Sequence, residues 1–156
     1  MRRFQFPLAR LQRVRELGEE LARSELLAAE STLHEAEARL EHARGELRGA
    51  EAHIARLQAD AQLAPGEVLA AQLTLPALSA RTSERRAEVT VAAKAVDEAR
   101  AAWQAARIEV RALERLEERA RDVFREEERG REDKVLAEIV DRKAAIDSAG
   151  NVGESR

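Results

Sequence analysis

Three histidines are the side chains in this sequence that could most readily bind a metal. His34, His42 and His53 lie eight and eleven residues apart. A helix brings residues three or four apart onto one face, so this spacing puts no two imidazoles on adjacent turns, as a zinc site would need. His34 and Glu35 also lack the second histidine of a zinc-protease helix. We therefore expect solvated surface histidines and no bound metal.

Other catalytic constellations are equally hard to assemble. Gly45 and Gly49 stand four apart with no Lys-Ser or Lys-Thr behind them, so they form no phosphate-binding loop. There is no cysteine for thiol chemistry, and the many carboxylates suit exposed helix faces that need charge for solubility. An active site needs a pocket that excludes water, which two slender helices scarcely provide. We expect no enzyme and no cofactor.

The composition favours an all-α chain of long helices. Of 156 residues, 3% are aromatic and 37% charged, and the apolar 44% relies heavily on alanine. Such side chains fill a narrow contact between helices better than a wide core. A net charge of −3 gives no general attraction to nucleic acid. No apolar stretch is long enough to span a membrane, no secretory signal is visible, and the predicted location is the cytoplasm.

A strict seven-residue apolar repeat runs through the first half of the chain. This period makes paired helices supercoil left-handedly, and we call the line of residues through which two helices pair the seam. The predicted seam of the first helix comprises Ala22, Leu26, Ala29, Leu33, Ala36, Leu40, Ala43, Leu47, Ala50, Ile54, Leu57 and Ala61. Upstream, Leu11, Val14 and Gly18 step by three and four, which predicts a stutter that locally relaxes the supercoil.

The second half repeats the pattern. Its predicted seam comprises Val89, Ala92, Val96, Ala99, Trp103, Ala106, Val110 and Leu113, and continues less regularly through Leu116, Ala120, Val123 and Phe124. After a polar stretch, apolar spacing resumes at Val135, Leu136, Ile139, Val140 and Ile146.

Prolines set the expected boundaries. Pro7 can open a helix, whereas Pro65 and Pro76 should interrupt one. We expect helix one at about 7–63, a connector at 64–75 and helix two at about 76–146, together one coiled-coil domain over residues 1–147. Residues 148–156, with two glycines, are predicted to form a disordered tail.

Two seams joined by a short connector predict an antiparallel coiled-coil hairpin. Folding at residue 70 would pair positions whose numbers add up to about 140, which places Trp103 near Ala36. The basic stretch with Arg10, Arg13 and Arg15 would then lie beside the acidic stretch 126–133. Phe4, Phe6 and Leu8 would reach the level of Val135, Leu136 and Ile139, giving the paired termini an apolar cluster.

Some surfaces have more than one interpretation. The arginine-rich start with Phe4 and Phe6 could grip nucleic acid or lie on a membrane surface, although the acidic stretch would oppose the first. The aliphatic residues of the connector could form a short helix that caps the hairpin, or an exposed docking surface. They comprise Val68, Leu69, Leu73, Leu75 and Leu78.

The two ends of the chain resemble the FliJ family, the small coiled-coil component of the bacterial flagellar type III export apparatus. The opening MRRFQFPLARLQRVR is similar to the basic, Phe-containing start of that family. Near the other end the family often has a Glu-x-Lys-x-Leu-Asp-Glu run. The chain has Ala137 in place of the aspartate and keeps Glu132, Lys134, Leu136 and Glu138. The resemblance spans residues 1–147, and the injectisome counterpart is the nearest confusable relative.

This resemblance implies a stalk like that of the rotary ATPase γ subunit, with the paired termini inserted into a hexameric flagellar export ATPase. It also implies contacts with the cytoplasmic domain of the membrane export gate and with export chaperones, at the inner face of the cell membrane. The ring-facing candidates are Phe4, Phe6, Leu8, Arg10, Leu11, Arg13, Leu136 and Ile139. The gate or chaperone candidates at the connector are Leu69, Leu73 and Leu78.

The alternatives are an injectisome-type stalk or a generic coiled-coil scaffold, and then a basic-arm nucleic-acid binder. If adding the chain enhanced ATP hydrolysis by a purified export ATPase, the result would favour the stalk function over these alternatives. A gel shift that persists at physiological salt would favour the nucleic-acid binder.

Overall fold

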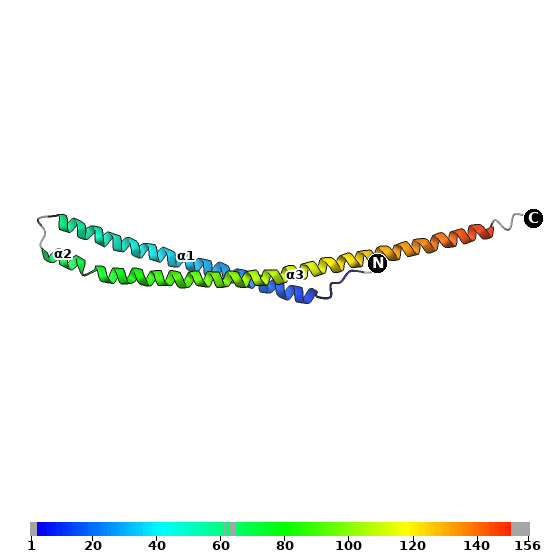
Figure 1. The fold of residues 1–156 in the computed structure, drawn as a ribbon, viewed down its shortest axis with the longest axis horizontal. Coiled ribbons are helices and arrows are strands. Elements are labelled where there is room, and N and C mark those ends of the chain that lie inside the picture. The colour runs from blue at the N-terminus through cyan, green and yellow to red at the C-terminus, as the bar shows by residue number, and fades with distance from the viewer. Residues whose placement is uncertain (1–2, 61, 63–64, 151–156) are drawn as a thin grey trace, which may run out of the picture. The chain divides into compact units, whose positions relative to one another are not determined.

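The computed structural model describes residues 3–60, 62 and 65–150, and every regular element in them is an α-helix. Helix α1 spans Ala9–Ala59, α2 spans Pro65–Gln72 and α3 spans Leu75–Gly150 (Figure 1). The two long helices confirm the predicted all-α coiled-coil hairpin.

The ends of the helices follow the prolines and the chain's backbone hydrogen bonds. The backbone N–H of Ala9 donates to the carbonyl of Phe6 at 3.2 Å, so α1 starts just after Pro7. Pro65 is the first residue of α2 and Pro76 is the second of α3, positions whose N–H has no acceptor within its helix. Only two residues separate α2 from α3.

The downstream end of α3 differs from the expectation. The helix continues to Gly150, so residues 148–150 are helical rather than part of a disordered tail. The rest of the expected tail, 151–156, lies outside the described residues, as does Ala61 of the predicted seam. Contacts within the chain divide it into two compact units. We call residues 16–108 the hairpin body, and residues 1–15 with 109–156 the terminal unit.

The hairpin body is held by a narrow seam. Every described residue of the predicted first-half seam is buried or half-buried, as is every predicted seam residue from Val89 to Ala106. The most covered side chains of the body are Ala22, Leu26, Ala36, Leu40, Ala43, Ile54, Thr82, Ala92 and Val96. No large side chain among the described residues is completely buried, so the seam excludes water but forms no wide core.

The register of the hairpin body differs from the prediction. Ion pairs join Arg81 to Glu46 at 3.2 Å, Arg39 to Glu88 at 3.9 Å and Arg100 to Glu30 at 3.6 Å. The numbers of these partners add up to about 127–130 instead of 140. The expected pairing of Trp103 with Ala36 is therefore wrong, and Ala36 shares a groove with Ala92.

The reason for the shift is the position of the reversal. Helix α1 ends at Ala59, and α2, which begins at Pro65, already runs alongside the end of α1 (Figure 1). Ala50, His53 and Leu57 of α1 line a groove with residues of α2. Most of the expected connector, residues 65–72, thus belongs to the returning arm of the hairpin.

The predicted stutter near the start of α1 is also wrong. Leu11 and Val14 are 41% and 62% exposed, whereas Gln12 and Glu19 are half-buried. Gln12 and Glu19 are seven residues apart and Glu19 precedes Ala22 by three, so the half-buried positions keep the heptad spacing of the seam. Polar side chains occupy these two seam positions, which a search for apolar spacing passes over.

Candidate partner-binding surfaces

An aromatic contact fastens the N-terminal segment to α3 in the terminal unit. The rings of Phe4 and Phe124 lie 5.7 Å apart, tilted by 59°. The guanidinium of Arg121 lies 5.5 Å from the centre of the Phe4 ring, within cation–π range. Phe4, which precedes α1, therefore packs against α3 through the ring of Phe124 and the guanidinium of Arg121.

A polar network continues from this contact. Glu117 accepts a hydrogen bond from Arg121 at 2.6 Å and another from the side-chain amide of Gln12 at 3.2 Å. Arg15 forms an ion pair with Glu109 at 3.0 Å. Of the basic residues at the start of α1, Arg15 is thus matched by Glu109, and no ion pair among the described residues joins this start to the acidic stretch 126–133 as expected.

The predicted ring-facing residues are only partly brought together. Phe4 and Phe6 are half-buried, Leu8 and Leu11 are about two-fifths exposed, and Arg10 and Arg13 are exposed. Phe4 lies beside Phe124, which precedes Leu136 by twelve residues or about 18 Å of helix. The expected single cluster of Phe4, Phe6 and Leu8 with Val135, Leu136 and Ile139 is therefore wrong.

The last part of α3 presents an apolar stripe instead. Every residue from Arg129 to Ala149 is exposed, and no described residue packs over this stretch. Val135, Leu136, Ile139 and Val140 are 55–64% exposed, and Ile146 is 69% exposed. Their spacing places them on one side of the helix. We call these five residues the C-terminal stripe.

The connector combines both interpretations of its aliphatic residues. It contains the short helix α2, yet Leu69 and Leu73 remain 58% and 71% exposed. Leu78 is half-buried in the seam line of α3, and its carbonyl accepts the Thr82 hydroxyl at 2.9 Å. Of the three predicted gate or chaperone residues, Leu69 and Leu73 are therefore available to a partner.

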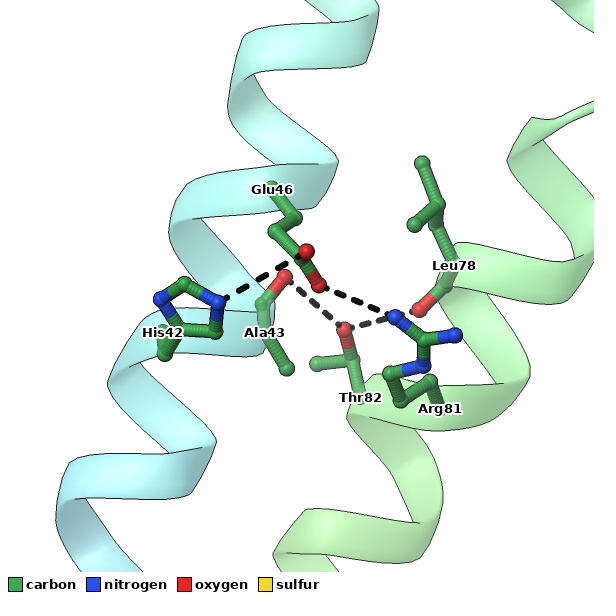
Figure 2. Close-up of polar contacts among 6 residues, drawn as sticks. All are labelled: His42, Ala43, Glu46, Leu78, Arg81 and Thr82. Atoms are coloured by element: carbon green, nitrogen blue, oxygen red, sulfur yellow. Dashed lines mark hydrogen bonds and ion pairs between the residues drawn. The ribbon is translucent and has the colours of Figure 1, made fainter.

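Thr82 is a seam residue that the apolar pattern missed. Its hydroxyl donates to the carbonyl of Leu78 and lies 3.5 Å from the carbonyl of Ala43 on the facing helix (Figure 2). Beside it, Glu46 bridges His42 at 3.6 Å and Arg81 at 3.2 Å. The sequence signal that could have identified Thr82 as a seam residue is its heptad position, four residues after Leu78.

Several ionisable groups of the hairpin body form ion pairs on exposed helix faces. The hydrogen bond from Arg48 at 2.8 Å, with its positive charge and that of Arg44, lowers the pKa of Glu41 below its usual range. Across residues 3–60, 62 and 65–150, no three histidine or carboxylate side chains gather as a metal site. The same residues contain no helix long and apolar enough to cross a membrane.

Two long helices paired along a heptad seam define the class of this chain as a coiled-coil protein. The family model described as Flagellar FliJ protein matches residues 4–146. The chain belongs to the FliJ family, and is a component of the bacterial flagellar export apparatus. No curated protein and no solved structure matches the chain.

Proposed function

We propose that this chain acts as a stalk in the flagellar export ATPase ring and escorts export chaperones and their substrates to the membrane gate. The observation that supports this proposal most is the C-terminal stripe. An apolar helix face of this size normally meets a partner, and a helix that enters a ring needs a face with no neighbour from its own chain. The likeness of the family to the rotary ATPase γ-subunit stalk is part of the same proposal.

The second surface of the proposal is the connector. Leu69 and Leu73 supply exposed leucines on and just after α2, at the end of the hairpin body where the chain reverses. Leucines spaced by four suit docking to a groove or to a helix of a partner. We assign this surface to the cytoplasmic domain of the export gate or to export chaperones, with the protein held peripherally at the inner face of the cell membrane.

The ring contact is tested by placing charge on the C-terminal stripe. We expect the unaltered chain to increase hydrolysis and ring formation when titrated into purified flagellar export ATPase. The double variant Leu136→Glu/Ile139→Glu should lose at least about tenfold of its apparent affinity, because each glutamate would have to be desolvated in the contact. ATP hydrolysis and negative-stain electron microscopy are the measurements.

The matched control for this experiment is Ala137→Glu, which adds one carboxylate on the opposite side of the same turn. It should retain activation. The ring assignment would be contradicted if the double variant and Ala137→Glu lost equal amounts of apparent affinity, or if the unaltered chain had no effect on the ATPase. Either result would favour an injectisome or scaffold role.

The connector contact is tested separately. Leu69→Glu/Leu73→Glu should weaken binding of the purified cytoplasmic gate domain or of an export chaperone by about tenfold or more, while activation of the ATPase persists. Surface plasmon resonance with each partner measures the affinity. Gln72→Glu, which adds a charge beside the same leucines, is the control. Unchanged binding of both partners to the leucine variant would remove this surface from the proposal.

A further inference from the structure

A groove runs between α1 and α3 on one lateral side of the hairpin body, away from the connector. It has a volume of about 680 Å³, and small side chains form much of its floor and walls. Its lining comprises Thr32, Ala36, Arg39, Glu84, Ala87, Glu88, Val91, Ala92 and Ala95. Val91 is 70% exposed, so the groove holds an aliphatic side chain that nothing in the described chain covers.

The other lateral side of the hairpin body is different in character. There, Glu41 pairs with Arg44 and Arg48 along α1, and Arg100 of α3 pairs with Glu30 across the seam. Charges on that side satisfy one another in solvent. The grooved side has ion pairs as well, such as Arg39 with Glu88, but it also leaves Val91 exposed.

The shape of the groove suits a third helix. Ala87, Val91 and Ala95 rise along α3 in steps of four, and Thr32 and Ala36 do the same on α1. Residues four apart form one ridge of a helix, and short side chains let another backbone approach closely. The bulky residues of an amphipathic helix would fit between the two ridges.

The charges around the groove decide which helix fits. Two carboxylates and one guanidinium line it. Arg39 and Arg85 both pair with Glu88, at 3.9 and 2.8 Å, whereas no ion pair within the described part of the chain involves Glu84. Glu98, one heptad beyond Val91, has only an exposed contact with Lys94 at 3.9 Å. Along α3, carboxylates therefore lie one heptad to either side of Val91: Glu84 lines the groove, and Glu98 follows on the same side of the helix just beyond the lining.

We propose that this groove binds a basic amphipathic helix of another protein, with its aliphatic side chains on Val91 and lysine or arginine beside Glu84 and Glu98. A second copy of this chain fits less well. A twofold axis at Val91 would bring Glu84 of one copy opposite Glu98 of the other, because both lie seven residues from that point, and like charges repel. The inference does not rest on the ring or gate assignments.

The test uses two labelled synthetic peptides of about 20 residues, both with leucine at helical spacing, one flanked by lysines and the other by glutamates. Fluorescence anisotropy with the full chain should show the lysine peptide binding at least about tenfold more tightly, and the preference should shrink as salt rises. Val91→Glu should weaken binding of the lysine peptide by about tenfold. Thr90→Glu, one position away and off the groove, should not.

A charge exchange completes the test. Glu84→Lys/Glu98→Lys should reverse the preference in favour of the glutamate peptide, with helix content unchanged by circular dichroism. Failure of both peptides to bind at about 1 mM, or equal binding of both, would overturn the proposal. So would sedimentation equilibrium that shows a dimer which Val91→Glu dissociates, because the occupant would then be a second copy.

Discussion

Replacing Leu40 with alanine is expected to lower the free energy of unfolding by about 2–4 kcal/mol. Leu40 is 7% exposed in the seam of the hairpin body. Removing most of a buried leucine side chain loses its transfer free energy and leaves a cavity that the neighbours only partly fill. Because no large side chain in the described seam is completely buried, some collapse should keep the cost below the upper end known for wide cores. Urea unfolding followed by circular dichroism measures it.

Leu27 provides the control on the same helix. It is 58% exposed and lies outside the seam, so Leu27→Ala should change the free energy of unfolding by less than about 0.5 kcal/mol. Alanine has a slightly better helix propensity than leucine, which helps rather than hinders this variant. If the two substitutions had equal costs, the burial pattern described here would be wrong.

A disulfide between residues 43 and 82 is expected to form in the double variant Ala43→Cys/Thr82→Cys. The Thr82 hydroxyl lies 3.5 Å from the Ala43 carbonyl, so the two backbones approach closely there. The natural chain has no cysteine, so no other thiol competes. The crosslink closes a loop of about 40 residues, for which loop entropy gives about 4 kcal/mol of added stability. Mobility on a non-reducing gel and thermal unfolding with and without reductant measure both effects.

The opposing register supplies the comparison. Ala36→Cys/Trp103→Cys would crosslink if the hairpin folded about residue 70, and should stay reduced in the register observed here. If the second pair formed a disulfide and the first pair did not, the hairpin would have the register folded about residue 70. The two variants therefore give opposite results for the two alignments of the same helices.

The seam could be predicted because its burial and its sequence period have the same cause. From Ala22 to Leu57, alanine and larger aliphatic residues recur at the spacing that keeps one face of a helix against its partner. The prediction failed where polar residues take seam positions. Gln12, Glu117 and Thr82 are covered because each finds a hydrogen-bond acceptor or donor nearby, and hydropathy alone does not show that a partner will be there.

The register could not be predicted for a different reason. Heptad seams fit together equally well after a shift of a whole repeat, so the choice depends on where the chain reverses. Pro65 and Pro76 predict a connector whose middle is at about residue 70, but Pro65 begins α2 and the returning arm starts there. A proline marks both a break and a favourable first residue of a helix, and the sequence did not distinguish them.

The candidate surfaces, too, could be predicted from the sequence only in part. Leu69, Leu73, Leu136 and Ile139 were singled out as aliphatic residues in excess of what a seam needs, and all four are exposed. The predicted grouping of Leu136 and Ile139 with Phe4 failed because it depended on the register. The groove at Val91 was missed altogether, since it arises from two helices side by side and neither helix alone has a marked apolar face at that point.

The narrowness of the seam also determines how the hairpin body opens. Each layer of side chains touches only the layers before and after it, so opening one stretch does not require the whole seam to separate. Amide hydrogen exchange should then be graded along α1, slowest around Ala36 to Ala43, where burial is most complete. A partner bound at any one place would protect mainly the adjacent turns, and bound surfaces on this protein can be mapped by the amides that stop exchanging.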